Sequence, residues 1–201
     1  VSMTADEAKP FVGLMSRIKA RDGVYSILGN HDYAEYMRML TDEEKEADVK
    51  ELCAMQNRAG WTLLDNTSTL VKRGNDSIAI LGVENDGNPP FPQYGDLPKT
   101  LKGLKEGIFK VLLSHDPTHW RRAVLPETDI QLMLSGHTHA TQFKLGSFSP
   151  SRFVYSDCWD GLFTEGARHL FVSSGMGAVM FPFRFGAWPE VAVITLKKSA
   201  K

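Results

Sequence analysis

The chain has 201 residues, of which 42% are hydrophobic and 23% are charged, and its formal net charge is −1. This composition is typical of an ordinary globular domain with enough apolar material for one core, and the near-neutral charge without a basic stripe argues against a nucleic-acid partner. No apolar run approaches the roughly 20 residues that are needed to cross a bilayer, so we expect no membrane span in this chain.

The predicted elements are helices, strands and one long loop. In chain order they are a helix over 4–20, a strand over 24–28, a helix over 41–59, strands over 61–64, 69–73 and 77–83, a surface loop over 84–98, a helix over 97–105, a strand over 108–113, a helix over 118–124, and strands over 130–134, 170–173 and 191–196. The first helix has no strand ahead of it, which suggests that a β-α-β portion is missing in front.

Local signals mark several of these boundaries. Thr4 and Glu7 fit a capping box at the start of the first helix, and Thr41 and Glu44 repeat that signature at the start of the second. The sequence Gly-Asn-Asp at 74–76 is typical of the turn between two strands of a hairpin. These boundaries rest on short-range chemistry alone.

The two cysteines, Cys53 and Cys158, lie far apart in the sequence and have no spacing that indicates a disulfide. We therefore expect two reduced thiols. No cysteine lies near the histidine clusters described next, which argues against a structural zinc finger.

Three loops that carry histidine each follow a predicted buried strand. They are Gly29-Asn30-His31-Asp32, Ser114-His115-Asp116 and Gly136-His137-Thr138-His139. Five of the six histidines lie in or beside these clusters, and histidines scattered through a core would not gather in this way. Neutral imidazole is the commonest metal ligand in proteins, so the pattern predicts a metal site at the strand ends.

The residue types narrow the kind of metal. His137 and His139 are one residue apart, so in an extended segment both side chains would point to one side and could bind one metal or straddle a pair. The Asn30 amide oxygen is a hard ligand and the His115 imidazole a borderline one. Such mixed nitrogen and oxygen ligands suit manganese, iron or zinc better than calcium or magnesium.

Three further side chains each leave two interpretations open. If His31 points away from its neighbour Asn30, it would not share a metal ion with it, and its imidazole would be suited to protonating a leaving oxygen or to stabilising developing charge. Asp32 either orients His31 or caps the turn or a following helix. His119 could contact substrate, but a capping or packing role is the stronger interpretation.

Taken together and in this order, the three clusters resemble the later motifs of the calcineurin-like metallophosphoesterases. The resemblance covers most of the chain, including Gly175-Met176-Gly177, and is closest to bacterial small phosphodiesterases that often follow membrane-spanning segments. It implies a four-layer α/β/β/α sandwich. It also implies hydrolysis of phosphodiester or phosphomonoester bonds by a hydroxide that two divalent or trivalent metal ions activate, with manganese, iron or zinc as the candidates.

The resemblance also implies roles for individual residues. Asn30, His115 and His137 would hold the second metal, and His139 the first. His31 would act as the acid or charge stabiliser, with Asp32 as its partner. One departure is small: Ala140 stands where the subgroup often has a second glycine.

A larger departure concerns the start of the chain. The family opens with an Asp-x-His pair and a Gly-Asp motif whose aspartate bridges the metals, and neither occurs ahead of Asn30. We therefore expect residues 1–201 to form a single metallophosphoesterase domain that is incomplete at its N-terminus and lacks the first β-α-β portion. An upstream segment could carry a membrane anchor, so the protein would be either cytoplasmic or membrane-associated. The alternative function is a non-catalytic binding or scaffold domain that retains the fold.

Overall fold

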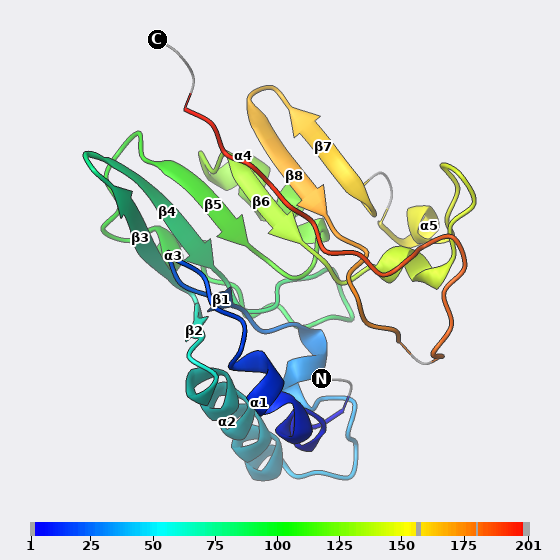
Figure 1. The fold of residues 1–201 in the computed structure, drawn as a ribbon. Coiled ribbons are helices and arrows are strands. Elements are labelled where there is room, and N and C mark those ends of the chain that lie inside the picture. The colour runs from blue at the N-terminus through cyan, green and yellow to red at the C-terminus, as the bar shows by residue number, and fades with distance from the viewer. Residues whose placement is uncertain (1–2, 156–157, 180, 199–201) are drawn as a thin grey trace.

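A computed structural model describes residues 3–155, 158–179 and 181–198 of the chain. Its main feature is a six-stranded sheet with the order β3-β4-β5-β6-β8-β7 (Figure 1). The strands are β3 (Thr67–Arg73), β4 (Asp76–Gly82), β5 (Phe109–Leu113), β6 (Leu132–Ser135), β7 (Gly161–Glu165) and β8 (Arg168–Val172). The strands predicted over 69–73, 77–83, 108–113, 130–134 and 170–173 are confirmed as β3, β4, β5, β6 and β8, with boundaries shifted by at most two residues.

The four central strands, β4, β5, β6 and β8, run parallel, and β3 and β7 pair antiparallel at the two edges. Residues Gly82 and Leu113 are partners in this register, as are Leu113 and Leu134. Parallel strands end at the same edge of a sheet, so the loops that follow β4, β5, β6 and β8 all begin there. This edge is where the predicted site should lie.

A second, smaller sheet lies in front of the first. It pairs β1 (Tyr25–Ser26) with β2 (Thr62–Leu63) in parallel. The two sheets meet at Gly82: a Cβ atom on this glycine would lie 2.3 Å from Leu64 Cβ and 2.9 Å from Ile27 Cγ2. Only a glycine permits this approach, which brings the loop after β1 to the same edge as the loops of the large sheet.

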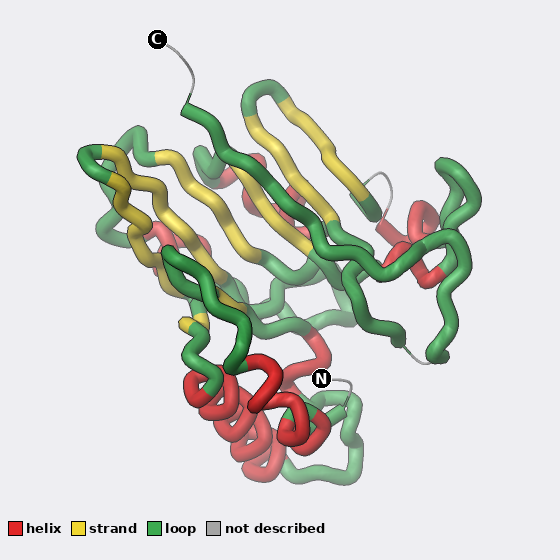
Figure 2. Tube along the Cα trace, viewed as in Figure 1, coloured by secondary structure: helices red, strands yellow, loops and turns green. Residues whose placement is uncertain are grey.

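The longest helix is α2 (Asp42–Arg58), which lies with the N-terminal helical turns below the sheets (Figure 2). The capping box predicted for it is present: the Thr41 hydroxyl accepts from Glu44 N at 3.2 Å, and Thr41 N donates to Glu44 Oε2 at 2.7 Å. The remaining helical elements are α3 (Leu97–Leu101), a π-helical segment (Trp120–Val124) that continues into α4 (Leu125–Glu127), and α5 (Ser151–Tyr155). Among the described ranges, no helix is long and apolar enough to cross a membrane.

The apolar residues form two buried clusters. The larger joins strands β4, β5, β6 and β8 of the main sheet to side chains that include Leu97, Trp120, Val124 and Ile130. The smaller joins Leu52 and Met55 of α2 to Leu28 and Tyr33. The second cluster therefore supports the segment that carries the first histidine motif.

The helix predicted over 4–20 is wrong in its length. The structure has 3-10 turns at Ala5–Glu7 and Lys9–Phe11 and a helix, α1, of only four residues (Val12–Met15). Pro10 lacks an amide hydrogen and interrupts the α-helical ladder. Thr4 makes no capping hydrogen bond from its side chain, and Ala5 N instead donates to Asp48 of α2.

The strand predicted over 191–196 is also wrong. This segment has an alternating apolar pattern but no strand partner within the described residues, and Val193 is 90% exposed. It is tied down at its two ends, where Glu190 N donates to Gly175 O and Lys198 pairs with Asp76. Both α5 and β7 were missed by the sequence-based prediction.

The α/β fold is confirmed, with a large mixed sheet, a small second sheet and helices packed on them. Cys53 and Cys158 form no disulfide with each other. The segment 84–98 is a loop, but its first part is not at the surface, because Asn85 and Asp86 are buried.

Candidate functional site

Three donor atoms from three different loops meet at the carboxyl edge of the sheets. Asn30 Oδ1 lies 3.1 Å from His115 Nε2, and His115 Nε2 lies 3.2 Å from His137 Nδ1. Asn30 follows β1, His115 follows β5, and His137 follows β6. The shared edge of the parallel strands therefore brings together residues that are up to 107 positions apart in sequence.

Neighbouring groups fix the orientation of this trio. The Asn30 amide donates from Nδ2 to the Tyr36 hydroxyl at 2.7 Å, which leaves Oδ1 facing His115. Asn30 is 1% exposed. A Cβ atom on Gly29 would lie 2.8 Å from the His115 ring, so the backbone of the first motif packs directly on that imidazole.

His137 is enclosed on several sides. The rings of Phe91 and Tyr155 make edge contacts with it, at centroid distances of 4.6 and 5.5 Å. Its Nε2 lies 3.3 Å from Asp116 Oδ2, on the side of the ring away from His115. Phe91 belongs to the 84–98 loop, so this loop borders the site rather than serving as a plain connection.

The segment that carries His137 and His139 is not extended, so the sequence argument that would place both side chains on one side does not apply. The chain turns sharply here, with φ values of 68° at His137 and 49° at His139. The His139 ring instead meets Arg184, whose Nη2 donates to His139 Nδ1 at 3.1 Å. A guanidinium can only donate, so in this arrangement Nδ1 accepts and the neutral His139 ring carries its proton on Nε2.

Arg184 is itself held by backbone carbonyls. It donates to Ser174 O at 2.8 Å, to Gly177 O at 2.8 Å and to Ala187 O at 3.0 Å. These bonds join the loop after β8 to the segment that carries Arg184. The arginine therefore brings a fixed positive charge to the His139 side of the site.

His31 and Asp32 lie beside the trio. The His31 ring packs on Tyr36 at a centroid distance of 4.6 Å, and a charge on His31 would lower the pKa of His115, His137 and His139. Asp32 Oδ2 accepts from Gly29 N at 2.8 Å, which is the turn-capping role that the sequence left open.

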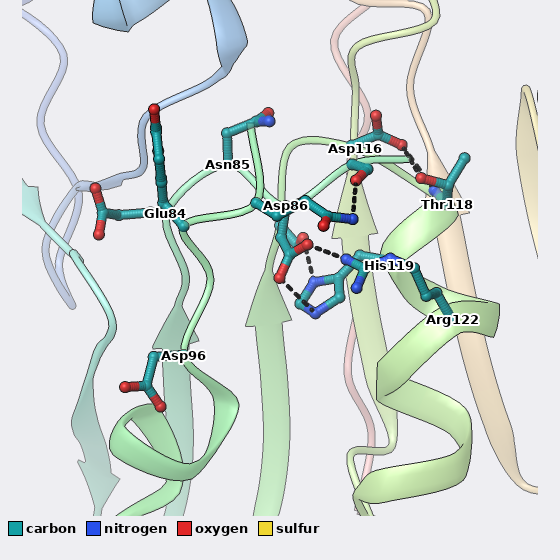
Figure 3. Close-up of polar contacts among 12 residues, drawn as sticks. Glu84, Asn85, Asp86, Asp96, Asp116, Thr118, His119 and Arg122 are labelled. Carbon is teal, nitrogen blue, oxygen red and sulfur yellow. Dashed lines mark hydrogen bonds and ion pairs between the residues drawn. The ribbon is translucent and has the colours of Figure 1, made fainter. Parts of the chain in front are cut away.

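His119 lies beneath the site. The imidazole is 1% exposed, with Nδ1 at 2.9 Å from Ser114 Oγ and Nε2 at 3.5 Å from Asp86 Oδ2. Asp86 also pairs with Arg122, and Figure 3 shows its carboxylate between His119 and Arg122. This burial favours the packing role of His119 over contact with substrate.

Burial keeps the histidines of the site uncharged. It is the largest cause that lowers the pKa of His115, which falls far below 6.5, and also the largest for His137 and His139. The nearby histidines add to the effect at His115, and Arg184 adds to it at His139. Neutral imidazole is the form that binds metals, so the environment favours ligand chemistry at neutral pH.

The donor set fits a first-row transition metal. Ligands on adjacent positions of one metal, each about 2.1 Å from it, lie about 3.0–3.4 Å apart. The two distances in the trio, 3.1 and 3.2 Å, fall in that range. Among residues 3–155, 158–179 and 181–198, no three His, Cys, Asp or Glu side chains form such a group by themselves. The Asn30 amide completes it.

Sequence reasoning assigned no site role to several residues that surround the trio. They are Tyr36, Phe91, Asp116 and Tyr155. Asp116 stands in the second histidine motif, which was a usable signal. The other three come from segments whose path depends on tertiary packing.

A comparison with protein families identifies the family of this chain. Residues 5–141, which contain the three histidine motifs, match the family model described as calcineurin-like phosphoesterase. The chain belongs to the calcineurin-like phosphoesterase family. The superfamily and the α/β fold expected from the motifs are thereby confirmed.

Curated relatives of this phosphoesterase domain include bacterial and animal proteins. The chain is 32% identical to the uncharacterized metallophosphoesterase YkuE of Bacillus subtilis over 198 residues, which cover 94% of the chain and 61% of that protein. It is 29% identical to a transmembrane protein with metallophosphoesterase domain of Danio rerio, covering 99% of the chain and 43% of that protein. It is 25% identical to the phosphodiesterase YaeI of Escherichia coli, covering 92% of the chain and 63% of that protein. No solved structure matches the chain.

The chain thus spans about 40–60% of the length of the curated relatives it matches. Family membership supports a metal-dependent phosphoesterase in general terms.

Proposed function

We propose that the protein hydrolyses phosphoesters with the help of metal ions held at the carboxyl edge of its sheets. The observation that carries this proposal is the meeting of Asn30 Oδ1, His115 Nε2 and His137 Nδ1 at distances of 3.1 and 3.2 Å. Three donors on three separate loops, of which two are partly buried neutral imidazoles, suit a transition metal.

Asn30, His115 and His137 would hold one metal ion, with manganese, iron or zinc as the fitting ions. When bound, such an ion polarises a phosphoryl oxygen and stabilises the negative charge that develops in hydrolysis. Tyr36 orients the Asn30 amide for this purpose, and Gly29 lets the backbone approach His115 closely.

A second metal ion would use His139, which requires its ring to release Arg184. The remaining ligands of that ion, including a bridging carboxylate, would come from a portion of the protein that precedes residue 1. Residues 1–201 would then be one incomplete domain of a two-metal enzyme.

His31 would supply the proton chemistry. Its ring lies next to Tyr36 at the rim of the trio, where it can protonate a leaving oxygen or stabilise charge on the phosphoryl group. Asp32 would assist by fixing the turn that presents His31, since its carboxylate accepts from Gly29 N.

We further propose association with a membrane through a part of the protein upstream of residue 1. The relatives from Danio rerio and Bos taurus are named as transmembrane proteins with a metallophosphoesterase domain. Within this chain the phosphoesterase site itself would face the aqueous side.

The decisive experiment uses the full-length protein that contains this chain. It is stripped of metal, reloaded with Mn²⁺, and assayed with an aryl phosphodiester and an aryl phosphomonoester in parallel. We expect hydrolysis only after reloading, and the ratio of the two rates reports whether diesters or monoesters are preferred. Mn²⁺ binding without turnover of either ester would overturn the proposal in favour of a binding or scaffold domain.

A further inference from the structure

The carboxylate of Asp116 is buried directly behind His137. It follows β5 in sequence, next to His115, and is 0% exposed. A Cβ atom on Gly87 would lie 2.3 Å from Asp116 Oδ2, so the loop after β4 closes over this side chain. The carboxylate is therefore shielded from water on the side opposite to the metal-binding trio.

One oxygen of this carboxylate is held by a neighbour. Thr118 donates to Asp116 Oδ1 twice, from its backbone nitrogen at 2.8 Å and from its hydroxyl at 2.7 Å (Figure 3). The Thr118 hydroxyl accepts in turn from Asn88 N at 3.0 Å. These bonds fix the plane of the carboxylate and leave Oδ2 as its free acceptor.

The second oxygen points to His137. Asp116 Oδ2 lies 3.3 Å from His137 Nε2, and both atoms are buried. The two atoms are not aligned as a hydrogen bond, and within the described ranges neither of them has a hydrogen-bond partner. An unpaired carboxylate oxygen is costly to bury, so the proton of the neutral imidazole belongs on Nε2, between the two groups.

The consequence appears at the other nitrogen of the ring. When Nε2 carries the proton, Nδ1 carries the lone pair, and Nδ1 is the atom that lies 3.2 Å from His115 Nε2 in the trio. We propose that Asp116 is a positioning residue that holds His137 in the Nε2–H tautomer and so keeps the Nδ1 lone pair available for a metal ion. This inference rests on the proposed function, and it adds a carboxylate–histidine–metal relay to it.

Asp116 does not act as a ligand of the same ion in this geometry. Its Oδ1 is occupied by Thr118, and its Oδ2 meets the imidazole at the nitrogen that faces away from the trio. Its effect on a metal therefore passes through the imidazole ring.

Two substitutions separate this role from simple packing. In Asp116→Asn, Oδ1 still accepts from Thr118, but Nδ2 donates to His137 Nε2 and moves the imidazole proton to Nδ1, where it blocks the metal. In Asp116→Ala, the ring is free to adopt either tautomer. We expect Mn²⁺ affinity of the full-length protein to fall about 10–100-fold in Asp116→Asn and less in Asp116→Ala. A packing role predicts the reverse order, because alanine leaves a cavity and asparagine does not.

The matched control is Asp42→Asn, since the Asp42 side chain is fully exposed in the first turn of α2. It should leave Mn²⁺ affinity unchanged. A second measurement needs no metal: nitrogen-15 spectra of the imidazoles should show His137 as Nε2–H in the metal-free wild type and as Nδ1–H in Asp116→Asn.

The outcomes are distinct. Three results would each overturn the inference and leave the proposed function standing. They are wild-type Mn²⁺ affinity in Asp116→Asn, weaker Mn²⁺ binding in Asp116→Ala than in Asp116→Asn, and an Nδ1–H tautomer of His137 in the wild type. If the wild type binds no Mn²⁺, the proposed function fails and the inference fails with it. Should neither variant fold, the tautomer in the wild type decides alone.

Discussion

At the scale of single residues, His31 is the member of the site whose contribution can be separated from metal binding. It packs on Tyr36 and lies outside the Asn30–His115–His137 trio. We expect His31→Ala in the full-length, Mn²⁺-loaded protein to lower the rate of phosphodiester hydrolysis about 10²–10⁴-fold, because a general acid contributes on that order. Steady-state kinetics with an aryl phosphodiester measures the effect.

The matched control is His169→Ala. His169 lies in β8 and bonds to Thr164, outside the three motifs, so its replacement should leave the rate close to that of the wild type. A His31→Ala enzyme with wild-type turnover would remove His31 from the mechanism.

The burial of His119 predicts that the stability of the fold depends on pH. Burial lowers its pKa to about 4, whereas an unfolded histidine titrates near 6.5. Between these values the unfolded chain binds a proton that the folded chain does not, so stability falls as the pH drops from about 6.5 to about 4. At pH 5, His119 lowers the free energy of unfolding by about 2 kcal/mol, and the other histidines whose pKa burial lowers act in the same direction.

Urea unfolding of metal-free protein at pH 7 and pH 5 tests this prediction. His119→Asn offers Ser114 an acceptor in place of Nδ1 but cannot take up a proton. Between pH 7 and pH 5, we expect the free energy of unfolding to fall by about 2 kcal/mol less in the variant than in the wild type. An equal decrease in the two proteins would contradict the lowered pKa of His119.

At the scale of secondary-structure elements, short-range chemistry decided which predictions succeeded. The helix α2 was predicted closely because Thr41 and Glu44 cap it through bonds that involve only four consecutive residues. The prediction of a long N-terminal helix was wrong because Pro10 interrupts the α-helical hydrogen-bond ladder. The prediction of a strand over 191–196 was wrong because a strand needs a partner strand, which its own sequence cannot supply.

The cap of α2 can be tested directly. Thr41→Ala removes the hydroxyl that accepts from Glu44 N, and we expect a loss of about 1 kcal/mol in the free energy of unfolding. Urea denaturation gives the value, and Glu43→Gln in the same turn, which leaves that bond intact, serves as the control. Phosphoesterase activity at low temperature should not change in either variant, since Thr41 and Glu43 are exposed at the N-terminal end of α2.

At the scale of the whole molecule, the position of the site was predictable and its surroundings were not. The loops after β5 and β6 meet because these parallel strands end at one edge of the main sheet, which follows from the α/β pattern alone. The loop after β1 reaches the same edge through the packing of the small sheet at Gly82. The contacts of His137 with Phe91 and of His139 with Arg184 depend on long loops, whose paths no local signal determines.

The crossing of the two sheets at Gly82 should therefore control both stability and the site. In Gly82→Ala the added methyl would overlap Leu64 and Ile27, and we expect a loss of about 1–3 kcal/mol in unfolding free energy. Because Ile27 leads directly to Gly29 and Asn30, Mn²⁺ affinity should weaken as well.

Calorimetric titration and urea unfolding report these two effects. Gly13→Ala provides the control, since nothing lies within 4 Å of a Cβ atom at that position. A Gly82→Ala protein with wild-type stability would show that the two sheets do not cross as closely as described.

The left-handed run His139–Gln142 limits which sequences this segment can accept. All four residues have φ between 45° and 60°, a region that glycine enters freely and β-branched side chains avoid. Thr141 is such a side chain, and its hydroxyl bonds to Ala140 O at 2.8 Å and meets Ser149 Oγ at 3.2 Å. Random mutagenesis of the segment should therefore recover glycine and asparagine at 140 and 142, and seldom valine or isoleucine.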